Sequence, residues 1–89
     1  MNLDRASIIA SIKAEIVKIA ATLDGDASDL QPDELIPASG YIDSAGLLEL
    51  IGWFEASYDF RVPAEEFTVD NLGTMDAMAG YLLRRKGAA

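Results

Sequence analysis

Apolar residues recur every three or four positions over residues 4–23, which is the spacing of one face of an α-helix. An acidic residue at the start of this segment and Gly25 beyond its end suit the two termini of a helix. The pattern therefore predicts a first helix over about residues 4–23. Its apolar stripe comprises Ile8, Ile12, Ile16, Ile19 and Leu23.

A polar stretch follows over residues 24–43 and contains two glycines and two prolines. It is long for a connection in a small domain. Residues 32–35, Pro-Asp-Glu-Leu, predict a single helical turn, because proline fits the first position of a helix and carboxylates favour that end. We expect Leu30, Leu35 and Ile36 to pin this loop to the core.

Three further helical segments are predicted beyond the loop. A second helix should run over about residues 44–58, with apolar side chains on one side and small or acidic ones on the other. A short helix over about residues 63–67 begins at a proline, and a last helix over about residues 75–86 follows Thr74, a suitable cap. The inward set of the second helix is Leu47, Leu50, Ile51, Phe54 and Tyr58.

These elements predict an all-α fold. We expect one domain over residues 1–89, built as a small antiparallel bundle of three to four helices with a long first loop. The segment YDFRV alternates enough to allow a short strand. A bundle of this kind does not by itself indicate a function.

Composition removes several kinds of chemistry. The 89 residues include no cysteine and no histidine, which excludes a disulfide framework, a thiolate metal site and Ser-His or Cys-His catalysis. We therefore expect no enzyme, no catalytic residues and no metal site. Lys13, Glu15 and Lys18 interrupt the apolar N-terminal stretch, so we expect neither a membrane span nor a signal peptide, and a cytoplasmic protein.

The net charge of −8 is concentrated in the middle of the chain. Thirteen of the fifteen acidic residues lie between Asp24 and Asp76, where Arg61 is the one basic residue. Such a field repels nucleic acids and anionic membranes and attracts basic protein surfaces. It predicts a protein partner with a Lys/Arg patch, while the alternative is that the charge serves only solubility.

The pair Asp43-Ser44 lies where the second helix should begin. Both residue types are typical of helix N-termini, where their side-chain oxygens accept the free amide hydrogens. One oxygen is enough for a cap, so if Asp43 takes that role, Ser44 is the first helical residue and its hydroxyl faces solvent. The pair is thus compatible with simple capping and with a chemical role for Ser44.

The residues around Ser44 resemble the 4'-phosphopantetheine attachment region of acyl and peptidyl carrier proteins. The matching features are Gly40, an aromatic and an apolar residue, Asp43-Ser44, the segment LLELIGWFEASYDFRVP, and Asn71-Leu72 before the last helix. The resemblance extends over about residues 35–83, and the first helix matches in length and pattern. The chain is therefore similar to a free-standing carrier protein with an acyl-carrier-protein-like fold.

The resemblance implies that Ser44 bears a 4'-phosphopantetheine arm, transferred from coenzyme A by a phosphopantetheinyl transferase, and that the neighbouring acid Asp43 helps this enzyme to recognise the site. The thiol of the arm would hold an acyl or aminoacyl group as a thioester, between a loading ligase and downstream transferases with basic patches. We expect a monomer that serves a specialised lipid or secondary-metabolite pathway and catalyses nothing itself. The cargo stays open among fatty acyl, malonyl, hydroxyacyl and aminoacyl groups.

Partners of such a carrier are expected on the exposed face of the second helix and on the acids that follow it. Ala45 stands where the family commonly has leucine, and Gly52 where a larger apolar residue is usual. This flatter surface favours a dedicated partner, and the bulk of Trp53 and Phe54 argues against a roomy pocket for a long acyl chain. The expected contact residues are Ala45, Leu48, Glu49, Gly52, Glu55, Asp59, Glu65 and Glu66.

Two other functions stay open. Asp24, Asp26 and Ser28 have the spacing of the first ligands in a calcium-binding helix-loop-helix, which would comprise residues 24–35. In that loop, however, Asp29 replaces the required glycine and Leu35 replaces the last glutamate. The second alternative is a small acidic adaptor that uses the second helix without modification.

Overall fold

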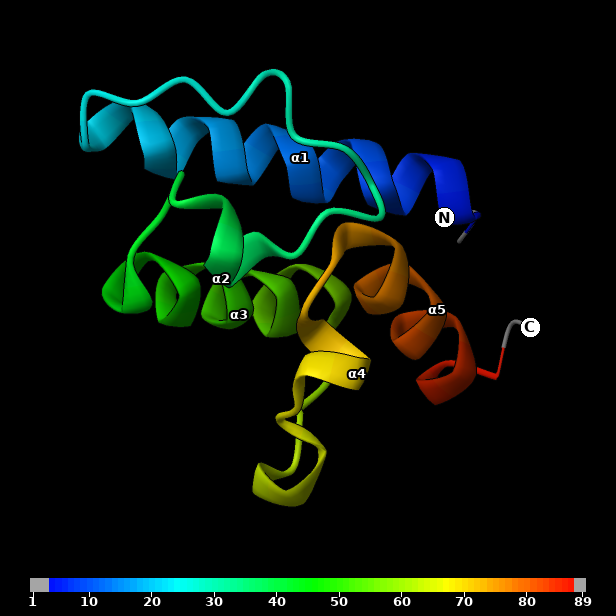
Figure 1. Cartoon of the computed structure of the whole chain (residues 1–89). Helices are drawn as coiled ribbons and strands as arrows, with labels where there is room; N and C mark the ends of the chain where they lie inside the picture. Colours follow the sequence, from blue (N-terminus) through cyan, green and yellow to red (C-terminus); the bar gives the residue numbers. More distant parts are fainter. Residues whose placement is uncertain (1–3, 88–89) are drawn as a thin grey trace.

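The computed structural model describes residues 4–87, and the regular elements of this range are all helical (Figure 1). No strand occurs in the described range, so the segment YDFRV does not form one. None of the helices in this range is both long and apolar enough to cross a membrane. The elements are α1 (Arg5–Thr22), α2 (Ile36–Ser39), α3 (Ser44–Tyr58), the 3-10 turn η1 (Ala64–Glu66), α4 (Val69–Leu72) and α5 (Met75–Arg85).

Helix α1 begins and ends where its sequence provides partners for the backbone. The Asp4 carboxylate accepts hydrogen bonds from the backbone N–H and the hydroxyl of Ser7, both at 2.9 Å. These bonds lower the pKa of Asp4, and the backbone bond is the largest cause. At the other end, Asp24 adopts a left-handed conformation with φ 61°, and the N–H of Gly25 donates to the carbonyl of Ala20 at 2.8 Å.

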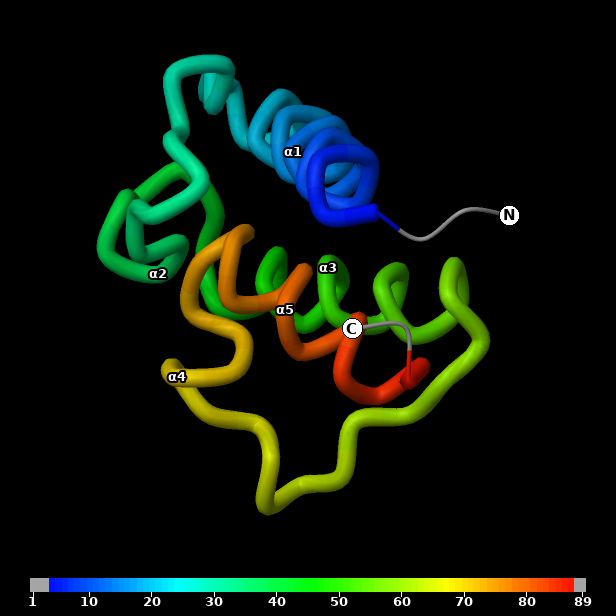
Figure 2. The backbone as a smooth tube through the Cα atoms, turned by 90° about the vertical axis from the view of Figure 1, so that its right-hand side faces the viewer, coloured from blue at the N-terminus to red at the C-terminus, as the bar shows by residue number. Residues whose placement is uncertain are grey.

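The three long helices enclose one core. Helix α1 runs roughly antiparallel to α3, lies above α3 and α5 in the view of Figure 1, and contacts both of them (Figures 1 and 2). Phe54 of α3 is fully buried, and its ring meets those of Tyr58 and Phe60 edge to face at centroid distances of 5.6 and 5.3 Å. The all-α bundle expected from the sequence is confirmed. Its largest fully buried side chains are Phe54, Ile8, Ile12, Ile16, Leu30, Ile36, Leu50, Met75, Met78 and Leu82.

The long connection between α1 and α3 runs back alongside α1 (Figure 1). Leu30 and Ile36 are fully buried, as expected. Two backbone hydrogen bonds also hold the connection: Ile36 N–H donates to the Gly73 carbonyl at 2.8 Å, and Asp76 N–H donates to the Pro32 carbonyl at 2.9 Å. The connection is therefore part of the folded structure rather than a free loop.

The sequence interpretation of this connection was wrong in two details. Residues 32–35 take part in a turn, in which Glu34 N–H donates to the Gln31 carbonyl at 3.1 Å, but they form no helix. The helical turn is α2, with Pro37 in its first turn, and it ends at Gly40 with φ 78°. Leu35 is 45% exposed and does not anchor the loop, because its neighbour Ile36 is the side chain that is buried in the core. Helical turns this short are set by contacts with the rest of the fold rather than by propensity.

Two further expectations need correction. Leu23 was placed in the apolar stripe of α1, but it is 50% exposed because the helix ends at Thr22 and this residue projects past the core. The turn expected over residues 63–67 is the shorter η1. The sequence did not predict α4, which follows η1. The Thr68 hydroxyl caps α4 by accepting a hydrogen bond from Asn71 N–H at 3.3 Å. Because the residues around Asn71 are mostly polar, the apolar spacing of the sequence did not indicate this helical turn.

A polar cluster ties the segment between α3 and α4 to α5. The hydroxyl of Tyr81 donates to the carboxylate of Glu66, and Arg85 donates to that hydroxyl at 2.7 Å. Arg85 also stacks over the rings of Phe60 and Tyr81. Because Tyr81 is only 4% exposed, its hydroxyl depends on these partners.

We predict that Tyr81→Phe lowers the free energy of unfolding by about 1–2 kcal/mol, because it leaves Glu66 and Arg85 without their shared partner. Burial, and next the hydrogen bond to Glu66, raise the pKa of Tyr81 above its usual value of 10.0. The stabilisation is therefore complete below about pH 10 and falls as the pH rises through the raised pKa. Urea unfolding at pH 7 and across pH 9–11 measures both effects. Tyr58→Phe is the control, and an equal loss in both variants would contradict the assignment.

Candidate functional site

The start of α3 separates the two roles that the Asp43-Ser44 pair could play. Asp43 has extended backbone geometry, and its Oδ1 accepts a hydrogen bond from the N–H of Gly46 at 2.8 Å. Its carbonyl accepts the first helical hydrogen bond, from Leu47 N–H at 2.9 Å. Asp43 is therefore the cap, and Ser44 is the first residue of the helix. The hydroxyl of Ser44 is not required to cap α3.

Ser44 lies on the surface beside an apolar hollow. The residue is exposed. The hollow has a volume of about 260 Å³ and is lined by Pro37, Ile42, Asp43, Ser44 and Leu47. A separate enzyme can thus reach the hydroxyl.

A second, smaller hollow continues the apolar surface away from Ser44. It has a volume of about 120 Å³, lies between α3 and α4, and shares Pro37 and Leu47 with the first hollow. Phe67 and Val69 form its outer wall and are 41% and 60% exposed. The sequence interpretation did not identify Pro37, Phe67 or Val69 as part of the site, because α2 and α4 bring them to α3 only in the folded chain.

Gly46 fixes the position of the start of α3. A Cβ atom at this residue would lie 3.0 Å from Cγ2 of Ile19 and 3.2 Å from Cβ of Ile42. Glycine therefore allows α3 to approach α1 within one turn of Ser44. The sequence contained no distinct sign of this contact, because Gly52 lies in the same helix and has nothing within 4 Å of its Cβ position.

The exposed face of α3 contains the residues expected to contact partners. Ala45, Glu49 and Gly52 are exposed, and Leu48 is 63% exposed, an unusual fraction for a large apolar side chain. Nothing lies within 4 Å of the position that a Cβ atom of Gly52 would occupy, so the helix surface is open there. The structure thus brings these four residues together on one face.

The acidic residues expected at the interface fall into two groups. Glu55 Oε2 accepts a hydrogen bond from Val62 N–H at 2.7 Å, and Glu66 holds Tyr81 and Arg85. These two carboxylates stabilise the segment after α3, which is a structural role independent of any partner protein. Glu49 and Glu65 are exposed, and neither takes part in the two ion pairs of residues 4–87, Arg5–Asp76 and Arg85–Glu66.

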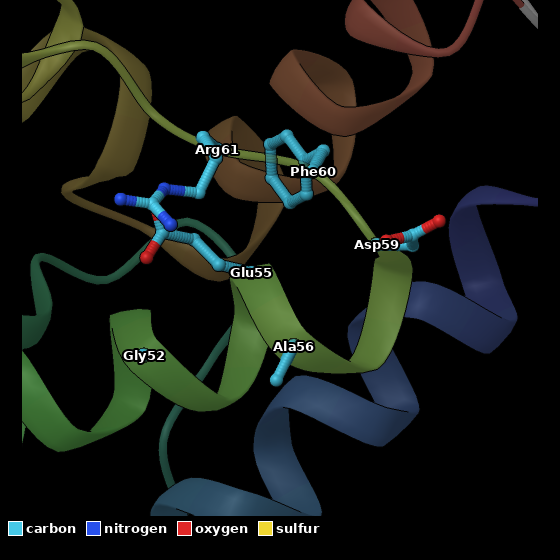
Figure 3. Close-up of a pocket in the computed structure, with 6 residues that line it drawn as sticks. All are labelled: Gly52, Glu55, Ala56, Asp59, Phe60 and Arg61. Carbon is cyan, nitrogen blue, oxygen red and sulfur yellow. The ribbon is translucent and has the colours of Figure 1, made fainter.

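Asp59 ends α3 and lies far along the helix from Ser44. It adopts a left-handed conformation with φ 53°, and its carbonyl accepts from Lys86 Nζ at 3.0 Å. It borders an open hollow of about 500 Å³ that is also lined by Gly52, Glu55, Phe60 and Arg61. Figure 3 shows the Asp59 side chain pointing away from those of Glu55 and Arg61. The acids at this end of α3 therefore do not converge on one point.

The geometry of residues 24–35 does not support the calcium alternative. Within the described range 4–87, no three carboxylates gather in a way that could hold a metal ion. Asp26 Oδ1 instead accepts from the N–H of Ser28 at 3.0 Å, and this bond is the main cause that lowers the pKa of Asp26. The carboxylate stabilises a local turn.

Three curated proteins from streptococci are similar to this chain over 64 residues. Two are the D-alanyl carrier proteins of Streptococcus thermophilus and Streptococcus gordonii, each 41% identical. The third is the D-alanyl carrier protein of Streptococcus sanguinis, at 42% identity. Each match spans 71% of this chain and 80% of the relative. No family model and no solved structure matches the chain.

We predict that Asp43→Ala destabilises the protein by about 1 kcal/mol, whereas Ser44→Ala costs clearly less, because only the aspartate accepts the Gly46 amide. Urea unfolding of the two variants measures the difference. Asp43→Asn is the matched control, since asparagine also caps helices and should keep most of the stability. A larger loss for Ser44→Ala than for Asp43→Ala would contradict the assignment of the cap.

Proposed function

This chain belongs to the family of acyl and peptidyl carrier proteins, and we propose that it carries its cargo on a 4'-phosphopantetheine arm attached to Ser44. The observation that carries the proposal is the arrangement at the start of α3. Asp43 takes the cap, which leaves the exposed hydroxyl of Ser44 for modification. When bound, the arm supplies a thiol, a group that the chain itself lacks because it contains no cysteine.

The residues around Ser44 fit the phosphodiester and the arm. The first turn of an α-helix favours a negative charge, because its free N–H groups and the helix dipole both point toward it. The carboxylate of Asp43 accepts a hydrogen bond from the Gly46 N–H through Oδ1. The apolar walls formed by Pro37, Ile42 and Leu47 lie next to the serine. This surface suits the aliphatic part of the arm.

The modification requires a nucleophilic oxygen on this chain and a base on another protein. In the proposed reaction, Ser44 Oγ forms a bond to the phosphorus atom that bears the pantetheine of coenzyme A. The pyrophosphate linkage breaks, and adenosine 3',5'-bisphosphate leaves. The proton of the serine passes to the phosphopantetheinyl transferase, because the chain has no histidine to accept it. Asp43, adjacent to the serine, takes the role of recognition acid.

We place the partner contacts on α3 close to the serine. Ala45, Leu48 and Gly52 offer a low apolar surface, and Glu49 provides a charge for basic residues of the loading ligase and the downstream transferases. Glu65 adds a second exposed carboxylate beyond the helix. Contacts of this kind are small, transient and weakened by salt.

A small aminoacyl group is the cargo that we propose. The three relatives are named for a D-alanyl group. The two apolar hollows next to Ser44 measure about 260 and 120 Å³, and both are open to the surface rather than enclosed. Open hollows offer little shelter to a long acyl chain, whereas a small aminoacyl group needs none.

Incubation of the purified chain with a broad-specificity phosphopantetheinyl transferase, Mg²⁺ and coenzyme A tests the attachment site. We expect intact-mass analysis to show one arm added to the wild type and none to Ser44→Ala. Ser57→Ala, an exposed serine on the same helix, is the matched control and should be modified fully. Addition of an arm to Ser44→Ala would refute the site, and an unmodified wild type would favour the adaptor.

Intact-mass analysis of the chain from the cell that encodes it tests the cargo. We expect the mass of the arm plus a small aminoacyl group, and removal of that group by neutral hydroxylamine, which cleaves thioesters. Ser44→Ala expressed in the same cell should show neither mass. A long acyl chain on the arm would contradict the proposed cargo while leaving the carrier function intact.

A further inference from the structure

The chain between α3 and α4, residues 59–68, borders the smaller apolar hollow that lies between these two helices. This segment extends away from the bundle (Figures 1 and 2), and none of its residues is buried. Helix α4, which follows it, packs on α5 and has few contacts with α3. Burial of apolar surface, the main force that positions the long helices, therefore contributes little to the position of this segment.

Polar contacts hold the end of the segment that lies next to the hollow. The carboxylate of Glu66 accepts hydrogen bonds from the hydroxyl of Tyr81 and from Arg85. The carbonyl of Glu66 accepts from the side-chain amide of Asn71 and from Thr68 N–H, both at 2.9 Å. Tyr81 is 4% exposed and lies within the regular helix α5, so it is the fixed member of this group. Glu66 is thus the point at which the segment is attached to α5.

This attachment lies directly beside the outer wall of the hollow. Phe67 follows Glu66 in the chain and forms that wall together with Val69, while Leu47 and Ile51 belong to α3. Phe67 and Val69 are 41% and 60% exposed, so apolar contacts do not fix the wall. The hollow measures about 120 Å³, less than the cavity of about 150 Å³ that accommodates benzene. With the wall in this position, the hollow has room for a small apolar group only.

We propose that Tyr81 and Arg85, acting through Glu66, keep the outer wall close to α3 and thereby restrict the hollow to small groups carried on the arm. Neither Tyr81 nor Arg85 lines this hollow or the surface beside Ser44, so both are positioning residues. Without their hold on Glu66, the wall is free to move away from α3, and the hollow becomes deeper. This inference rests on the proposed carrier function and assigns the limit on cargo size to residues outside the attachment site.

Thioesters of two chain lengths on the arm test this inference. The wild type, Glu66→Ala and Tyr81→Phe are each loaded by a broad-specificity phosphopantetheinyl transferase, from octanoyl-coenzyme A or from acetyl-coenzyme A. Neutral hydroxylamine then attacks the thioester carbonyl, which forms a hydroxamic acid and frees the thiol of the arm, and intact mass follows this loss with time. The measured quantity is the ratio of the octanoyl to the acetyl cleavage rate on the same variant.

On the wild type, we expect this ratio to equal that of the two free coenzyme A thioesters, because the hollow does not shelter the longer chain. In Glu66→Ala and Tyr81→Phe, we expect the ratio to fall, because the octanoyl chain enters the widened hollow and hydroxylamine reaches its thioester less often. A fall of about fourfold corresponds to the burial of one further methylene group. The acetyl thioester of each variant corrects for any other effect of the substitution.

Two control variants separate this positioning role from a general loss of stability. Glu66→Gln keeps an oxygen that accepts from Tyr81, so it should retain the wild-type ratio. Asp4→Ala removes the cap of α1, which does not line the hollow, and should lower the stability by about 1 kcal/mol without changing the ratio. Urea unfolding checks the stability of all variants.

The outcomes distinguish this inference from the carrier function on which it rests. An unchanged ratio in Glu66→Ala or Tyr81→Phe would overturn the inference, as would an equal fall in either control. Slow cleavage of the octanoyl group on the wild type would also overturn it. Failure of the wild type to gain any arm would instead overturn the proposed carrier function.

Discussion

The close contact between α1 and the start of α3 determines what this protein can present at its surface. Gly46 lies so close to Ile19 and Ile42 that an added Cβ atom would displace them by a few tenths of an ångström, so the first turn of α3 packs tightly against α1. The N–H of the same glycine binds the Asp43 carboxylate. Packing and capping thus act on one residue, and together they set the exposed hydroxyl of Ser44 at the edge of the bundle.

The carboxylates of the acidic middle segment do different kinds of work. Asp43 caps a helix, Glu55 accepts from the backbone of Val62, and Glu66 orders Tyr81 and Arg85. These three acids hold local structure, whereas Glu49 is available on the open face of α3. Net charge alone attracts basic partners at long range, but the folded structure decides which charges a partner can contact.

Ser44 lies between surfaces of different character. On one side, Pro37 and Leu47 lead into an apolar hollow toward α4. On the other side, Leu23 and Glu49 border a hollow with an acidic rim. In the proposed function, a group attached at Ser44 rests on the first surface. This arrangement suits a domain that lacks reactive groups of its own and whose cargo must be handed to other proteins.

The sequence by itself was sufficient to identify the long helices and the all-α class, because apolar spacing and capping residues act over a few positions. The attachment role of Ser44 stays a prediction that rests on the resemblance to carrier proteins. The sequence did not determine α2 and α4, whose few residues become helical only through contacts such as the hydrogen bond from Ile36 to Gly73. Nor could spacing show that Leu23 leaves the core or that Glu66 is engaged by Tyr81, since both follow from how distant segments meet. Local periodicity can be read from the sequence, whereas the surfaces beside Ser44 form only when packing brings α1, α2 and α4 against α3.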